Sequence, residues 1–217
     1  MRRAARLGVP LLALAAVLAH AQVGGEPGGR RAARPAAPDW EFAATGYWNA
    51  PRAGDAYASG IFAAERGPLH LEARANYEAV HAQSAFVGWT FAAGDAIKVE
   101  ATPIVGVVTG ALRGTIAGLE ASIAAGRFDY YIEAEHVRDR QGKDGDYTYA
   151  WSEAGFRPVE WLRVGLVTQR TRAYGGERDL QRGGFAQVSQ GTLTFSAYWF
   201  NPGSQEQVVI VSVGASF

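Results

Sequence analysis

The chain has 217 residues, 48% of them hydrophobic, and its 21 basic side chains are balanced by 21 acidic ones. Without a basic excess a nucleic-acid partner is not expected, and without cysteine there is no disulfide framework or thiolate metal site. Beyond the N-terminal region, no segment approaches the roughly 18 uninterrupted apolar residues that indicate a transmembrane helix. A membrane β-barrel is still possible, because only one face of each of its strands is apolar.

The N-terminus has the pattern of a secretory signal peptide. Three arginines stand within the first six residues, an apolar run covers 7–18, and the sequence AHA at 19–21 supplies a small-x-small cleavage site. The apolar run is shorter than the roughly 20 residues that a membrane-spanning helix needs. We predict a signal peptide over 1–21, against the alternative of a buried N-terminal helix. Its removal takes away three of the 21 basic residues and leaves 18 basic against 21 acidic ones.

Residues 22–39 are rich in Gly, Pro, Ala and Arg and show no hydrophobic periodicity. This composition predicts a flexible periplasmic lead-in. Its three arginines could contact anionic lipid or peptidoglycan, although a solvated tail is the simpler interpretation. The remaining residues, 40–217, form the one predicted domain.

From residue 40 onward the chain reads as extended segments of about ten residues separated by turns. In 40–49, one face carries Trp40, Phe42, Ala44, Gly46 and Trp48, because side chains alternate along a strand. The two tryptophans are separated by roughly 26 Å along such a strand. With the usual tilt, their vertical separation of about 20 Å approaches the apolar band between two aromatic girdles of a membrane barrel.

Residues 69–80 show the clearest alternation. One face is apolar and ends at Tyr77, and the other face is polar. The polar face carries His70, Glu72, Arg74, Asn76 and Glu78. A strand over 69–80 therefore needs an apolar environment on one side and a polar one on the other. The segments 56–65, 84–92 and 97–108 are predicted as strands on the same grounds.

Residues 113–125 fit two patterns. Leu112, Ile116, Leu119 and Ile123 follow a helical stripe, but glycines within and beside the segment weaken a helix. We predict a strand here, with Leu119 facing outward and Glu120 facing inward.

Six further strands complete the prediction. They cover 128–138, 147–157, 161–172, 180–190, 192–200 and 208–217. The total is twelve, or ten if 113–125 is helical and 180–200 is one irregular strand. An even number places both termini on the periplasmic side. The short turns at 66–68, 93–95, 126–127 and 157–160 then lie on that side, and the longer or more polar loops at 139–146, 173–178 and 201–207 lie outside.

The last segment, VVIVSVGASF, ends on an aromatic residue. Its outer face carries Val209, Val211, Val213, Ala215 and Phe217. A terminal strand of this kind is expected to seal a barrel against the first strand. The segment resembles the terminal strand of Gram-negative outer-membrane β-barrel proteins. The resemblance implies a closed antiparallel transmembrane β-barrel in the cell outer membrane, with outer-membrane lipid and, through 208–217, the barrel-assembly machinery as partners.

A periplasmic soluble barrel that binds a small ligand is an alternative, because period two alone does not say which face is outside. The membrane barrel is favoured by small residues on the apolar face, by the aromatic end of the chain and by aromatic residues at strand ends. The predicted aromatic girdle consists of Trp40, Trp48, Tyr77, Trp89, Phe91, Trp161, Trp199 and Phe217.

The predicted lumen is lined by polar side chains; basic ones would cost about 2–4 kcal/mol at the lipid midplane. The lining residues are Glu72, Arg74, Asn76, Glu78, Lys98, Glu100, Asp129, Glu133, Glu135, Glu153 and Arg163. Their acidic excess predicts a porin-like channel for small hydrophilic solutes with a weak cation preference. In the alternative, inward Tyr47, Tyr131, Tyr149, Trp151 and Tyr198 plug a structural or cell-surface interaction barrel, whose charges form a buried network.

No enzymatic site is predicted. Lipid-hydrolysing outer-membrane barrels need a His and a Ser on one strand face beside a third polar group, whereas His81 and Ser84 have opposite parity. His70 has no serine nearby at matching parity. Glu133 and Glu135 share a face and could bind a divalent ion, but we interpret them as members of a charge network and predict no metal and no cofactor.

Overall fold

A computed structural model describes residues 39–142, 145–173 and 178–217. The predicted signal peptide and the lead-in as far as residue 38 lie outside these ranges. The strands are β1 Glu41–Pro51, β2 Tyr57–Arg66, β3 Leu69–Ala75, β4 Ala82–Trp89, β5 Phe91–Ala93, β6 Ile97–Gly110, β7 Gly114–Ala125, β8 Phe128–Asp139, β9 Tyr147–Val159, β10 Leu162–Ala173, β11 Arg178–Gln190, β12 Leu193–Phe200 and β13 Val208–Ser216. Among the described residues, no helix is long and apolar enough to cross a membrane.

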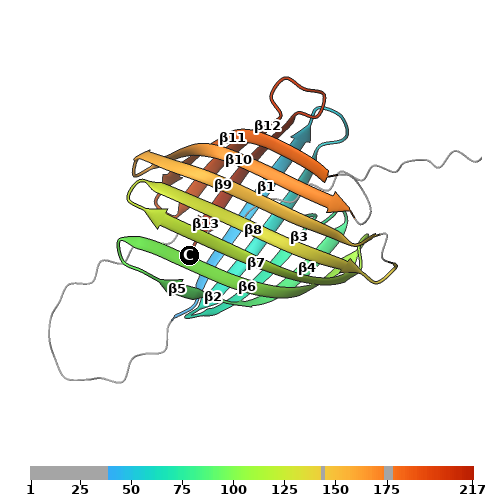
Figure 1. The fold of residues 1–217 in the computed structure, drawn as a ribbon, viewed down its shortest axis with the longest axis horizontal. Helices are drawn as coiled ribbons and strands as arrows, with labels where there is room; N and C mark the ends of the chain where they lie inside the picture. The colour runs from blue at the N-terminus through green and yellow to red at the C-terminus, as the bar shows by residue number, and fades with distance from the viewer. Residues whose placement is uncertain (1–38, 143–144, 174–177) are drawn as a thin grey trace, which may run out of the picture.

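The strands form one closed antiparallel barrel (Figure 1). Each strand pairs with its neighbours in sequence, and β1 pairs with β13 to close the ring. β4 and β5 both pair with β6 and are separated only at Thr90, so they form a single strand of the wall. The barrel therefore has the twelve strands predicted from the sequence, and the ten-strand alternative is wrong. β7 pairs residue by residue with β6 and β8, so the helical alternative for 113–125 is also wrong.

The wall is apolar outside, and inside it carries charged side chains beside a buried hydrophobic cluster. Trp48, Phe62 and Leu166 are exposed, whereas Glu72 and Glu153 are buried. Apolar side chains outside and charged side chains inside are the inverse of the arrangement in a soluble protein. The predicted strand faces are confirmed in β7, β9, β12 and β13, because alternate residues there are exposed and buried.

The two ends of the barrel differ. At the end that we call the terminal end, Phe42 and Phe217 exchange two backbone hydrogen bonds of 2.9 Å and their rings stack. The connections at this end, 67–68, 94–96, 126–127, 160–161 and 191–192, are short. The connections 52–56, 76–81 and 201–207 lie at the opposite end and are longer. The predicted short turns therefore lie together at one end, and the predicted loop 201–207 lies at the other, where the connection 111–113 is also short. The predicted loops 139–146 and 173–178 include 143–144 and 174–177, which lie outside the described residues.

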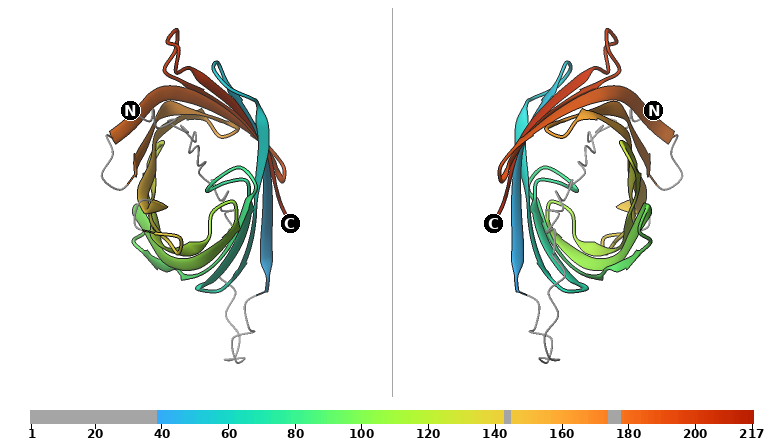
Figure 2. Two further views of the ribbon diagram at one scale, coloured as in Figure 1. Left: turned by 90° about the vertical axis from the view of Figure 1, so that its right-hand side faces the viewer. Right: turned by 90° about the vertical axis from the view of Figure 1, so that its left-hand side faces the viewer.

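One predicted strand is too long. The sequence predicts a strand over 69–80, but β3 ends at Ala75 because Asn76 has a φ of 54° and turns the chain. The backbone N–H of Asn76 donates to Ala82 O at 2.8 Å, and the Asn76 side chain accepts from the His81 N–H at 2.8 Å. The resulting connection, 76–81, folds into the barrel rather than extending its wall (Figure 2). Tyr77 and Glu78 in this connection are buried.

Candidate functional site: the charged interior

Arg74 on β3 is the centre of the larger of two charge networks. Its Nη1 donates to Glu135 Oε1 at 2.7 Å and to Glu133 Oε1 at 3.2 Å. Its Nη2 donates to Glu120 Oε1 at 3.4 Å, and its Nε donates to Glu72 Oε1. β3 therefore supplies the guanidinium, and β7 and β8 supply carboxylates from across the lumen.

The Arg74 network carries an excess of negative charge. A fifth carboxylate, Glu78, has its Oε1 at 3.5 Å from Arg74 Nη1. Five carboxyl groups therefore share one guanidinium. Tyr77 supplies a neutral donor, because its hydroxyl lies 3.1 Å from both carboxylate oxygens of Glu133. Burial raises the pKa of the Glu78 carboxyl above its ordinary value of 4.5, and Arg74 opposes that effect in part.

The second network surrounds Arg163 on β10. Its Nε donates to Asp129 Oδ1 at 2.8 Å, and its Nη1 donates to Glu153 Oε2 at 2.5 Å. Trp151 Nε1 donates to the other oxygen of Glu153 at 3.0 Å. Gly155 leaves space for Arg163 and Asp129, because a Cβ there would lie 2.5 Å from Arg163 Nε and 2.6 Å from Asp129 Oδ1.

Both buried arginines rest on aromatic rings. Arg74 Cζ lies 4.4 Å from the centre of the Phe86 ring and 4.5 Å from that of Tyr77. Arg163 Cζ lies 4.6 Å from the centre of the Phe185 ring. The phenylalanines in turn pair with glycines of the next strand, Phe86 with Gly106 and Phe185 with Gly165. Each guanidinium is therefore positioned by cation–π contact as well as by hydrogen bonds.

Side chains fill the lumen at mid-height. Glu133, Trp151 and Glu153 are each 0% exposed. Trp151 packs edge-on against Tyr198 and Phe200, with ring centres 5.3 Å apart in both pairs. The predicted plugging residues Tyr47, Tyr149, Trp151 and Tyr198 all belong to the buried core, and Tyr131 packs against it. At this level water has no access to the charged groups.

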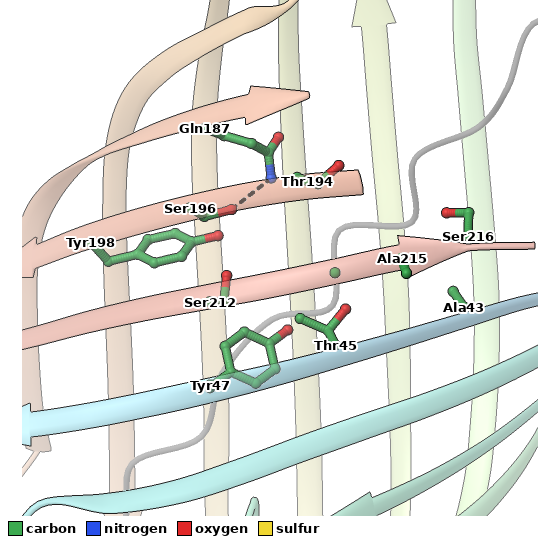
Figure 3. A pocket seen from close by; sticks show the side chains of 11 residues that line it. Ala43, Thr45, Tyr47, Gln187, Thr194, Ser196, Tyr198, Ser212, Ala215 and Ser216 are labelled. Atoms are coloured by element: carbon green, nitrogen blue, oxygen red, sulfur yellow. Dashed lines mark hydrogen bonds between the residues drawn. The ribbon is translucent and has the colours of Figure 1, made fainter. Parts of the chain in front are cut away.

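A small recess lies inside the wall toward the terminal end (Figure 3). Tyr47 and Tyr198 line its inner side, and Thr45, Ser196 and Ser212 give it hydroxyl groups. Its volume is about 20 Å³, which is enough for one or two water molecules. A recess of this size is too small for a solute.

Most of the predicted lumen-lining residues lie inside. The buried ones are Glu72, Arg74, Glu78, Glu133, Glu135, Glu153 and Arg163. Asp129 is half-buried and ion-paired. Glu100 is half-buried, whereas Lys98 is exposed near the start of β6 at the terminal end. Asn76 is half-buried in the β3–β4 connection, where its Nδ2 donates to Ala58 O at 3.0 Å.

The predicted aromatic girdle needs one correction. The outward, exposed members are Trp40, Trp48, Trp89, Phe91, Trp161, Trp199 and Phe217. Tyr77 is only 1% exposed and lies inside the barrel, because the turn at Asn76 removes it from the strand whose alternation placed it outside.

Several solved structures align with this chain at low similarity. The outer membrane protein opdK from Pseudomonas aeruginosa aligns at 9% identity and a TM-score of 0.43, over 74% of this chain and 57% of that one. A BenF-like porin from Pseudomonas fluorescens Pf-5 aligns at 8% identity and a TM-score of 0.43, over 79% and 58%. A loop-deletion mutant of OmpT, an outer membrane protein of Vibrio cholerae, aligns at 6% identity and a TM-score of 0.39, over 82% and 98%.

The likeness is remote in every case. The chain spans less than three fifths of the length of the first two of these proteins. No family model matches the sequence, and no curated protein matches it.

One buried group on the predicted polar face is absent from the predicted lumen lining. His70 on β3 is buried, and its Nδ1 lies 3.3 Å from Glu65 Oε1 on β2. The alternation had placed His70 on the same face as Glu72, which was the available signal. The carboxylate of Glu120, three strands farther along the wall, could not be assigned to the same place from the sequence.

Proposed function

We propose that the chain is an integral outer-membrane β-barrel whose lumen is closed, and that it serves as a structural or cell-surface interaction barrel. The observation that carries the closed lumen is the complete burial of Glu133, Trp151 and Glu153 at mid-height. In this proposal the charged residues stabilise the interior and do not conduct ions.

The outer surface supports a location in lipid. Leu119, Val105 and Val211 are exposed near the middle of their strands, and tryptophans are exposed near strand ends. Water would penalise such a continuous apolar belt, whereas hydrocarbon with aromatic side chains at its two boundaries accommodates it. Outer-membrane lipid is therefore the proposed surrounding medium, reached after export by the signal peptide at 1–21. Residues 208–217 are the proposed contact with the barrel-assembly machinery.

Conductance in planar bilayers tests the closed lumen. Wild-type barrel that is folded on a heat-modifiability gel should give no steady ion current. Tyr77→Ala combined with Trp151→Ala should open a path, because both side chains fill the lumen. Tyr130→Ala is the matched control, since that tyrosine is exposed on the outer face. A sustained current through the wild-type protein would contradict the closed lumen.

A channel for small solutes with a cation preference is the second candidate, and the acidic excess around Arg74 favours it. If the β3–β4 connection withdraws, carboxylates would line the opened path and attract cations. In the opened Tyr77→Ala, Trp151→Ala background, changing Glu133 and Glu135 to Gln should shift the reversal potential toward non-selectivity. An unchanged reversal potential would rule out these two carboxylates as the source of selectivity.

A further inference from the structure

An imidazole and two carboxylates converge inside the barrel, toward its terminal end. One ligand atom from each of His70, Glu72 and Glu120 lies within 4.8 Å of the others, and all three residues are buried. His70 Nε2 and Glu72 Oε2 are 4.0 Å apart. In a tetrahedral zinc site, two ligands bound at about 2.0–2.2 Å lie about 3.3–3.6 Å apart, so these atoms would have to approach one another by about 1 Å. Small side-chain rotations would therefore bring all three atoms to bonding distance of one ion.

Two of the converging atoms have no hydrogen-bond partner. His70 Nε2 and Glu72 Oε2 are both buried and unbonded. Buried polar atoms are normally hydrogen-bonded, and leaving one unpaired costs about 1–3 kcal/mol. Both atoms are lone-pair donors that point toward the same place, so one cation would satisfy both.

The other atoms of these side chains are already held in orientations that suit metal binding. Glu65 Oε1 lies 3.3 Å from His70 Nδ1, so a proton on Nδ1 leaves the Nε2 lone pair free. Arg74 Nε donates to Glu72 Oε1, which leaves Oε2 for another partner. Glu65 is partly exposed near the terminal end of the barrel, so it also marks a route from solvent to His70.

The charge of the surrounding network favours a bound cation. The only guanidinium of the Arg74 network faces five carboxyl groups, two of which belong to the converging set. A divalent ion would offset two of these negative charges among buried side chains. A proton held between His70 Nε2 and Glu72 Oε2 is the competing arrangement, and binding of an ion would release it.

We propose that His70, Glu72 and Glu120 bind a divalent transition-metal ion inside the barrel, with Zn²⁺ as the best match. An imidazole nitrogen with carboxylates suits zinc better than calcium or magnesium, which prefer oxygen ligands alone. Three protein ligands leave a position for water in a tetrahedral site. Glu65 is the outer partner that orients His70. The site goes beyond a closed structural barrel, because it gives the interior a specific ligand.

Calorimetric titration with Zn²⁺ tests the site. The barrel is extracted from the outer membrane without a polyhistidine tag, stripped with a chelator and kept folded in detergent micelles. One Zn²⁺ should bind per chain, and Ca²⁺ should not compete. Co²⁺ in place of Zn²⁺ should give visible absorption bands of a low-symmetry site. Absence of stoichiometric Zn²⁺ binding to the folded wild-type protein would overturn the proposal.

Variants locate the bound ion. His70→Gln and Glu120→Gln should each weaken Zn²⁺ binding by more than the roughly 10–100-fold expected of the outer-partner variant Glu65→Gln. Glu206→Gln is the control, because it removes an exposed carboxylate outside the Arg74 network, and its affinity should stay near wild type. If folded His70→Gln and Glu120→Gln both bind Zn²⁺ like wild type, the ion is adventitious and the site is wrong. Using both variants keeps the test valid if one of them fails to fold.

Discussion

Arg163 shows how a single buried charge is held in this barrel. Its guanidinium lies between the Phe185 ring and the carboxylates of Asp129 and Glu153. Burying such a group is costly, and a complete buried ion pair does little better than an apolar pair of the same size. Removing one partner is different, because the other charge then remains buried and uncompensated. Glu153, which is fully buried, would be left in that state if Arg163 were lost.

We predict that Arg163→Met lowers the free energy of unfolding by about 3–5 kcal/mol. The double variant with Glu153→Gln should recover part of this loss, because it removes the stranded carboxylate. Arg157→Gln is the control. Arg157 also pairs with Asp129, but its side chain is 42% exposed, so its loss should cost about 1 kcal/mol or less. Urea titrations followed by tryptophan fluorescence measure the differences; equal losses at 157 and 163 would contradict this account.

The β3–β4 connection is the element that most changes the interior. Asn76 and His81 both adopt left-handed backbone conformations, with φ values of 54° and 65°. These two residues bracket a compact connection whose Tyr77 and Glu78 side chains enter the lumen. Asparagine tolerates this conformation better than most residues and bonds locally to the backbone. One asparagine therefore ends a strand and places an acidic and an aromatic side chain inside.

Glu78 gives this connection a pH dependence. Its pKa in the folded barrel is raised above the ordinary 4.5 by burial, so folding favours the protonated carboxyl. Its contribution to stability is therefore complete below 4.5 and is lost as pH rises through the raised value. We predict that the unfolding free energy of wild type falls more steeply above pH 4.5 than that of Glu78→Gln. Urea titrations at several pH values test this, and parallel curves would contradict it.

Strand faces could be predicted from the sequence, whereas the contacts across the lumen could not. Alternation correctly placed Trp151 and Glu153 inside, because it depends only on neighbours along one strand. Tyr77 was placed outside, since the pattern of alternation continues through a turn that the backbone makes at Asn76. The proximity of His70 to Glu120 depends on the register and curvature of the strands between β3 and β7. The alternation of side chains within a single strand contains no information about that register or curvature.

For the molecule as a whole, the apolar belt determines which solvent the barrel tolerates. Leu119 is exposed near the middle of β7, with Pro103 and Ala134 beside it on the neighbouring strands. Val159 is exposed at the end of β9, next to a short turn. If lipid surrounds the wall, a charge should be far more costly at the first position than at the second. A soluble barrel would tolerate a charge equally well at both.

We predict that Leu119→Arg destabilises the folded barrel in lipid vesicles by about 2–4 kcal/mol, and that Val159→Arg costs about 0–1 kcal/mol. The depth dependence arises because an arginine at the rim reaches the headgroups, whereas one at the midplane cannot do so without distorting the bilayer. Denaturant titration in vesicles measures both. Two equal effects would count against a membrane location.

The packing of the interior near Arg74 depends on the absence of a side chain at Gly106. A Cβ at Gly106 would lie 2.4 Å from a ring carbon of Phe86, so the ring would have to tilt toward the axis. Arg74 packs against that ring and donates hydrogen bonds to the surrounding carboxylates, so a movement of the ring would displace them as well. A side chain at position 106 of the wall would thus disturb the Arg74 network in the interior.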